Sequence, residues 1–272
     1  MKRFLKGKDG RVMATIELKD IQKTYGKTEA VKHLNLTISE GELFGFLGPN
    51  GAGKTTTIKM MTGLLEPTEG TVEICGFDMW KKPMEAKRNI AYLPDQPNLY
   101  PKLTGWEFLR FIASVYQVNE DDFLERAEKY LHMFHLTDSA EDLLESYSHG
   151  MKQKIALVGA LVHDPKVIFL DEPTVGLDPG SARKLKELLR ELCDQGTTVF
   201  MSTHILEIAE NMCDRVGIIT NGSLLALGTM EELRAQGGND KATLEDIFLE
   251  LTAGEDSAEL IRSLESEDVN GK

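Results

Sequence analysis

The 272-residue sequence has few cysteines, no long apolar run and fewer basic than acidic residues. Its three cysteines, Cys75, Cys193 and Cys213, are far apart and form no CxxC pair, so we expect reduced thiols rather than a disulfide framework, a metal site or a redox pair. No uninterrupted apolar stretch approaches the roughly 20 residues that cross a bilayer, so we do not expect this chain to form a pore itself.

The charge balance is acidic, with 31 Lys and Arg against 44 Asp and Glu and a net charge of −13. Gripping a nucleic-acid backbone requires a basic face, so no nucleic-acid partner is expected. The opening MKRFLKGKDGR is basic but lacks the apolar core of a secretion signal, which predicts a cytoplasmic protein. We expect residues 1–13 to be a flexible extension and residues 255–272 to be an acidic tail.

Hydrophobic patterning places the structural elements. Residues 14–39 alternate between apolar and polar around a turn at Gly26 and predict two antiparallel strands. Residues 43–47 form a short apolar run, a glycine-rich loop follows, and residues 55–65 are predicted to be helical. The order strand, loop, helix matters for the chemistry below.

The middle of the chain, from about residue 94 to residue 150, reads as a helical insert, and Thr104 with Glu107 fits a capping box. Residues 166–171 and 197–202 are continuous β runs separated by a predicted helix at 181–193, as expected of parallel strands buried on both faces. The sequence therefore predicts an α/β fold around a mostly parallel sheet. A last strand at 223–226 and a small amphipathic helix at 244–251 are also predicted.

The loop at 48–55, GPNGAGKT, matches G-x-x-x-x-G-K-[ST] between a predicted strand and a predicted helix, which is the context that this motif requires. Glycines let backbone N–H groups turn inward around phosphate oxygens, and the helix points its positive end at them. Lys54 is then placed to reach the β and γ phosphates, and the Thr55 hydroxyl to bind Mg²⁺. The predicted nucleotide-binding residues here are Gly48, Pro49, Asn50, Gly51, Ala52, Gly53, Lys54, Thr55 and Thr56.

Two acids, Asp171 and Glu172, follow the apolar run VIFL. They lie at the carboxyl end of a predicted strand, which is where ligands bind in open α/β sheets. We expect Asp171 to hold Mg²⁺, and Glu172 to orient or deprotonate the water that attacks the γ phosphate. His204 follows another β run at the same edge. A lone histidine there is either structural or a contact of the γ phosphate.

A further segment, YSHGM at 147–151, opens an amphipathic helix and resembles the LSGGQ signature of ATP-binding cassette (ABC) proteins, with Ser148 and Gly150 kept. Tyr25 resembles the adenine-stacking aromatic of that family, residues 176–178 (GLD) resemble its D-loop, and His204 matches its switch histidine. The resemblance runs from about residue 16 to residue 228 with the motifs in the family's order.

The resemblance implies an ABC ATPase: a P-loop NTPase core with a mostly parallel sheet, an antiparallel β subdomain and a helical subdomain. It places the ATPase domain at 14–228, the helical subdomain at about 95–160 and a small helical extension at 229–254. It implies ATP and Mg²⁺ as cofactors and a head-to-tail cassette dimer, either a homodimer or a pseudo-symmetric pair. In that dimer Ser148, Gly150 and Asp178 contact the partner's nucleotide, and Glu172 and His204 are catalytic.

The chain departs from the family in four motif positions, one of which is Tyr147, where the signature has leucine. The family's glutamine that touches Mg²⁺ and the attacking water would fall at Asp95 or at Gln96, and both remain candidates. In the signature, His149 stands for the first glycine and Met151 for the glutamine.

Residues 93–111 and the segment LEDIFLEL at 244–251 resemble bacterial exporter ATPases related to the A subfamily. This resemblance implies a separate membrane permease, with the ATPase peripheral on the inner face of the membrane and the helical insert around Trp106 as the docking surface. The aromatic residues Phe108, Phe111 and Tyr116 suit either docking or a small helical core. The alternative function is a soluble cassette ATPase of a repair or cofactor-assembly complex.

Overall fold

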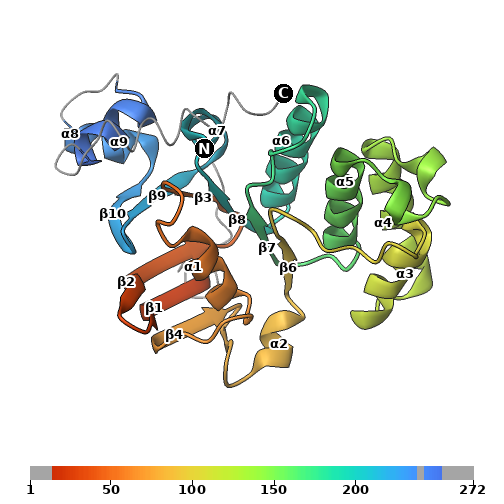
Figure 1. Cartoon of the computed structure of the whole chain (residues 1–272), viewed down its shortest axis with the longest axis horizontal. Coiled ribbons are helices and arrows are strands. Elements are labelled where there is room, and N and C mark those ends of the chain that lie inside the picture. Colours follow the sequence, from red (N-terminus) through yellow and green to blue (C-terminus); the bar gives the residue numbers. More distant parts are fainter. Residues whose placement is uncertain (1–13, 238–241, 253–272) are drawn as a thin grey trace.

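The computed structural model describes residues 14–237 and 242–252. The expected N-terminal extension at 1–13 and the acidic tail at 255–272 lie outside the described residues. Within the described part, the chain folds into two β-sheets, a group of helices on one side and a small helical group near the C-terminal end (Figure 1). No helix of this part is both long and apolar enough to span a bilayer.

The first sheet is antiparallel and has the strand order β2-β1-β4-β5. Its strands are β1 (Ala14–Tyr25), β2 (Thr28–Ser39), β4 (Glu69–Ile74) and β5 (Phe77–Asp78). The predicted pair at 14–39 is confirmed, since β1 and β2 are antiparallel and are joined at Gly26, whose φ of 60° suits a tight turn. Ile16, Leu18 and Ile21 bury their side chains toward the rest of the molecule.

The second sheet has the order β10-β9-β3-β8-β7-β6, and every neighbouring pair except β9 and β10 is parallel. Its strands are β3 (Leu43–Leu47), β6 (Ile90–Leu93), β7 (Val167–Asp171), β8 (Thr198–Thr203), β9 (Arg215–Thr220) and β10 (Ser223–Gly228). All residues of β3, β7 and β8 are buried, as expected of strands covered on both faces. The predicted mostly parallel α/β sheet is confirmed.

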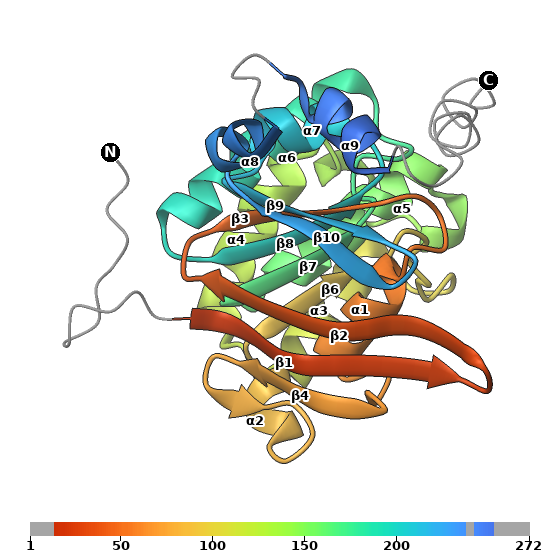
Figure 2. The same ribbon diagram turned by 90° about the vertical axis from the view of Figure 1, so that its left-hand side faces the viewer.

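Figure 2 shows the antiparallel sheet lying beneath the parallel one, with α1 between them. The layer between the sheets contains Phe44, Phe46, Phe169 and Phe200. The ring centres of the first three each lie within 6 Å of the ring centre of Phe200. Such tilted aromatic contacts add to the hydrophobic stabilisation of a core. This packing fixes the strands whose ends carry the candidate site.

The helices are α1 (Lys54–Met61), α2 (Pro83–Lys87), α3 (Gly105–Val115), α4 (Glu120–Met133), α5 (His149–Leu161), α6 (Pro179–Asp194), α7 (Leu206–Met212), α8 (Met230–Gly237) and α9 (Leu244–Thr252). The prediction of a helix over 55–65 was too long at its C-terminal end. Helix α1 ends at Met61, because Gly63 adopts a left-handed backbone with φ of 67°.

Helices α3, α4 and α5 form the helical insert, which lies to one side of the parallel sheet (Figure 1). The predicted capping box begins α3: the Thr104 hydroxyl accepts from the backbone N–H of Glu107 at 3.2 Å, and the Glu107 carboxylate accepts from the backbone N–H of Thr104 at 2.8 Å. Leu109, Phe123 and Ile155 bring the three helices onto one buried cluster.

Helices α7, α8 and α9 pack together near the C-terminal end, where Leu233, Leu244 and Phe248 form a separate buried cluster. An ion pair of 2.7 Å between Arg234 and Glu210 joins α8 to α7. The amphipathic helix predicted at 244–251 is therefore present and buries its apolar side here.

Candidate active site

The loop between β3 and α1 has a backbone that glycine alone accommodates well. Gly53 has φ of 109°, and a Cβ on it would lie 2.6 Å from the carbonyl oxygen of Ala30. Gly53 also occupies the N-cap of α1, so no side chain caps the helix, and no acid lies in its first turn. The first N–H groups of α1 are thus available to an anion, and the helix dipole favours negative charge there.

Lys54 lies inside this loop, where its side chain is almost entirely buried, with 6% of the residue exposed. Its ammonium donates to the carbonyl oxygens of Gly48 at 2.5 Å and Pro49 at 3.2 Å. The same nitrogen lies 3.9 Å from Oε1 of Glu172. A buried ammonium held beside uncapped helix N–H groups makes the pocket strongly attractive to phosphate.

Asp171 is buried at the carboxyl end of β7, and hydroxyl groups contact both of its oxygens. Thr55 donates to Oδ2 at 3.0 Å, and Ser202, on β8, donates to Oδ1 at 2.5 Å. An ionised carboxylate beside a hydroxyl is the kind of oxygen donor set that Mg²⁺ prefers, so Thr55 and Asp171 fit such an ion. Sequence reasoning missed Ser202, and its position directly before Thr203 and His204 carries no signal of this contact.

Glu172 follows β7 in a left-handed backbone conformation, with φ of 51°. Its Oε2 lies 3.0 Å from Nδ1 of His204, which is an ion-pair distance rather than an aligned hydrogen bond, and its backbone N–H donates to the carbonyl oxygen of Ser202 at 3.2 Å. A non-glycine residue held in this region is strained, and such residues cluster at functional sites. The structure thus brings Lys54, Glu172 and His204 together, as the sequence predicts.

Lys54, Asp171 and Glu172 line a pocket of about 240 Å³ together with Asp95, and His204 contacts Glu172 from outside the lining. Burial, followed by the charges of Asp171 and Glu172, raises the pKa of the Asp95 carboxyl. Gln96 is exposed and is not among the lining residues. Of the two candidates for the family's glutamine position, Asp95 is therefore the one that the structure directs to the pocket.

Comparisons with known proteins agree with this geometry. The sequence pattern of the ABC transporter family matches residues 31–175. The linearmycin resistance ATP-binding protein LnrL of Bacillus subtilis is 39% identical over 225 residues, which cover 83% of this chain and 72% of that protein. This chain belongs to the ABC transporter ATPase family.

Other relatives support the same ABC ATPase assignment. The probable multidrug ABC transporter ATP-binding protein YbhF of Escherichia coli is 38% identical over 87% of this chain and 41% of that protein. A solved ATP-binding subunit of an ABC transporter has a TM-score of 0.85 and 36% identity, covering 88% of this chain and 99% of that one. A cassette dimer in a post-hydrolysis state with ADP and Pi has a TM-score of 0.73 and 29% identity, covering 79% of this chain and 98% of that one.

Several predicted residues of this ABC ATPase are not lining residues of the pocket, namely Gly48, Ala52 and His204 beside it and Tyr25, Ser148, Gly150 and Asp178 elsewhere. Tyr25 is 50% exposed at the end of β1, with the ammonium of Lys23 5.4 Å from its ring centre. Ser148 is exposed at the N-cap of α5, where its hydroxyl accepts from the N–H of Met151 at 3.2 Å. Gly150 follows it in the first turn of the helix.

Asp178, in the D-loop, also lies outside the pocket and caps α6. Hydrogen bonds from Ser181 and Lys154 hold the pKa of the Asp178 carboxyl well below its usual range. His149 covers the same loop, since a Cβ on Gly176 would lie 2.6 Å from its ring. The signature and the D-loop therefore form one joined, outward-facing surface.

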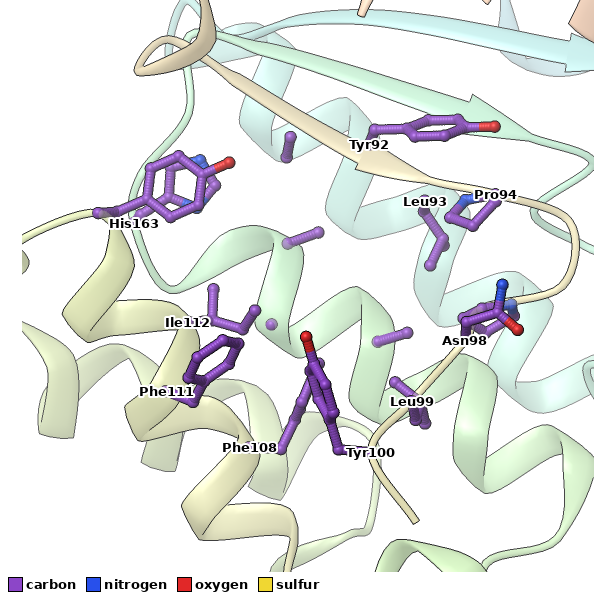
Figure 3. A pocket seen from close by; sticks show the side chains of 16 residues that line it. Tyr92, Leu93, Pro94, Asn98, Leu99, Tyr100, Phe108, Phe111, Ile112 and His163 are labelled. Carbon is purple, nitrogen blue, oxygen red and sulfur yellow. The ribbon is translucent and has the colours of Figure 1, made fainter. Parts of the chain in front are cut away.

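A second, more apolar groove of about 350 Å³ lies between β6, α3 and α5, and Figure 3 shows its lining. Tyr100 and Phe111 line it with 52% and 43% of their surfaces exposed, and their rings make an edge contact at 5.3 Å. Phe108, by contrast, is buried in the helical core as well as lining the groove. Trp106 packs edge-on against Phe123, on the core side of the insert.

One end of this groove is closed by the rings of Tyr116 and His163, which stack at 3.6 Å between centres. His163 Nε2 lies 3.0 Å from the carbonyl oxygen of Ile90, and burial lowers the pKa of the imidazole to about 4. A neutral ring therefore donates to Ile90 throughout the physiological pH range.

Proposed function

We propose that this chain is the ATP-hydrolysing subunit of an exporter whose membrane-spanning permease is a separate polypeptide. The observation that carries the proposal is the pocket that joins Lys54, Asp171 and Glu172 at one edge of the parallel sheet. Export is supported by two relatives, since LnrL is a linearmycin resistance ATP-binding protein and BcrA of Bacillus licheniformis is a bacitracin transport ATP-binding protein. BcrA is 38% identical over 77% of this chain.

In the proposed mechanism, the residues of this chain bind the triphosphate and position water. The loop N–H groups and Lys54 would hold the β and γ phosphates, while Thr55 and Asp171 would hold Mg²⁺, with Asp95 as the added oxygen donor. The ion, when bound, neutralises phosphate charge. Glu172 accepts a hydrogen bond from the attacking water, and His204 fixes the Glu172 carboxylate and approaches the γ phosphate.

We place a second copy of the cassette head-to-tail across the pocket. Ser148 and the N–H groups at the start of α5 form an anion-binding surface that lies outside this chain's own pocket, and Asp178 borders it. The natural ligand of that surface is the γ phosphate of ATP bound to the partner cassette. ATP would then close the pair, and hydrolysis would release it.

Mixing two inactive variants tests this arrangement. Lys54→Ala damages the loop, Ser148→Arg blocks the signature, and each alone should lack ATPase activity. In a mixed pair, the intact loop of one copy faces the intact signature of the other. Random pairing should therefore restore about a quarter of the wild-type rate.

The matched control mixes Lys54→Ala with the double variant Lys54→Ala, Ser148→Arg. That mixture contains no intact loop, so it should stay inactive. No recovery in the first mixture, when both of its variants are folded, would contradict head-to-tail pairing between copies of this chain.

The permease would dock in the apolar groove that Tyr100 and Phe111 line (Figure 3). Exposed aromatic rings beside a groove are typical of protein contact surfaces. The sequence predicts docking at the insert around Trp106. The proposed groove belongs to the same insert, but the Trp106 ring itself packs against the helical core and does not line the groove. The ATPase would thus sit peripherally on the inner face of the membrane.

A further inference from the structure

Helix α5 is linked to two loops that approach the proposed ATP sites. Gln153, in its second turn, donates from Nε2 to the main-chain oxygen of Asp95 at 3.1 Å. The next residue, Lys154, lies 3.2 Å from the carboxylate of Asp178 in the D-loop. The signature residue Ser148 begins the same helix. Helix α5 therefore contacts Asp95, which is proposed for the ATP site of the same chain. It also begins with Ser148, which is proposed to contact the ATP of the partner cassette.

Gln153 is an unusual side chain for its position. Only 3% of the residue is exposed, and its Oε1 has no hydrogen-bond partner among the described residues. A buried amide with an unpaired oxygen is destabilising, and an apolar side chain of similar size would avoid that penalty. The orientation of the amide is set by its neighbour, since only the NH₂ end can face a carbonyl oxygen favourably. Stability alone therefore does not account for glutamine at this position.

The carbonyl that Gln153 holds belongs to a residue of the ATP pocket. Asp95 lies two residues after the end of β6, and it lines the pocket together with Asp171 and Glu172. Fixing the main chain at Asp95 fixes where its carboxylate lies relative to those two acids. The first turns of α5 thus set the position of Asp95 through one hydrogen bond.

The same helix also forms a wall of the apolar groove. Ala156, Gly159 and Ala160 of α5 line it together with residues from Pro97 to Tyr100. Gly159 leaves room for Phe108, whose ring would lie 2.9 Å from a Cβ placed there. Gln153 therefore lies on α5 between the signature at its start and the groove along its later turns.

We propose that Gln153 is a positioning residue that ties the Asp95 segment to α5, so that a shift of α5 moves Asp95 relative to Asp171 and Glu172. The shift would come from the partner's ATP at Ser148 or from the permease in the groove. The inference rests on the proposed function, which assigns Asp95 a part in hydrolysis. Gln153 itself is not among the lining residues of the pocket and acts through the segment that it holds.

The test uses the full-length chain with the substitution Gln153→Leu, which keeps the volume and removes the donor. We expect ATP affinity to stay within about twofold, the melting temperature to stay equal or rise, and kcat to fall by roughly 10 to 100-fold, as for a small misplacement of a reacting group. Gln153→Glu keeps the shape, replaces the NH₂ group by an acceptor, and should lose at least as much kcat.

Ile155→Val is the matched control on the same helix. Ile155 is fully buried in the helical core, and loss of one methylene there lowers stability without touching Asp95. This variant should keep the kcat of the wild type. An equal loss of kcat in Ile155→Val would show that any disturbance of α5 suffices and would overturn the proposal.

Double variants identify the group through which Gln153 acts. Gln153→Leu should lower kcat little further in the Asp95→Ala background. In the Gln96→Ala background it should lower kcat by the same factor as in the wild type. A full further loss in both backgrounds would overturn the proposal. If the wild type lacks ATPase activity, the proposed function itself fails. If the wild type is active and folded Gln153→Leu keeps its kcat, only this inference fails.

Discussion

Replacing Lys54 by alanine is expected to abolish ATP binding. The ammonium is buried beside the uncapped start of α1 and donates to the carbonyl oxygens of Gly48 and Pro49. It is therefore positioned to contact the β and γ phosphates. Loss of a buried, charge-assisted contact costs a factor of about 100 or more in affinity, or roughly 3 kcal/mol. Titration calorimetry with ATP on the folded variant measures this change directly.

The control for this prediction is Lys59→Ala. Lys59 lies on the same helix but is exposed, so its removal takes away one positive charge without affecting the loop. ATP affinity should then stay within about twofold. Retention of tight ATP binding by folded Lys54→Ala would contradict the role of the loop.

Glu172→Gln is expected to bind ATP normally and to hydrolyse it about 10²- to 10⁴-fold more slowly, the range usual for loss of a general base. The amide keeps the shape of the side chain beside His204 but accepts protons far less well than the carboxylate. Because hydrolysis would separate the cassettes, ATP-bound pairs of this variant should accumulate. Steady-state ATPase rates and size-exclusion chromatography with and without ATP measure the two effects.

Glu207→Gln is a suitable comparison, since Glu207 is exposed on α7, three residues after His204. It should show wild-type turnover and no trapped pair. Near wild-type turnover by Glu172→Gln would exclude Glu172 as the catalytic carboxylate.

Much of the pocket could be predicted because its residues are local to strand ends. The loop after β3, the acids at the end of β7 and His204 after β8 each have a short-range signature, and these three strands are parallel neighbours. Their carboxyl ends consequently meet at one edge of the sheet. Convergence of Lys54, Asp171 and Glu172 follows from that topology without further information.

Contacts between distant segments could not be predicted in this way. The bond between Gln153 and the main chain of Asp95 joins residues 58 apart, and it depends on how the helical insert lies against β6. Ser202 looks like an ordinary strand residue until β8 is placed beside Asp171. Neither residue type nor spacing encodes these relations.

Two strands of the parallel sheet had no distinct signal in the sequence. Strand β6 has only four residues, and β9 contains Gly217, where a Cβ would lie 3.0 Å from the ring of Phe44. Glycine weakens a strand pattern, although here it permits close packing. The sequence likewise could not predict which aromatic residues of the insert are buried. In the structure Phe108 lies in the core, whereas Phe111 is exposed at the groove.

The proposed exporter requires a partner in the membrane. The decisive measurement is affinity purification of the full chain from gently detergent-solubilised membranes of its own cells, comparing the wild type with Phe111→Asp and with Lys54→Ala. We predict a multi-spanning protein at about a one-to-one ratio with the wild type and with Lys54→Ala, and its loss from Phe111→Asp, because a charge in the groove opposes apolar docking. Recovery of soluble partners alone, by a chain that still hydrolyses ATP, would contradict the exporter and favour an assembly-type ATPase.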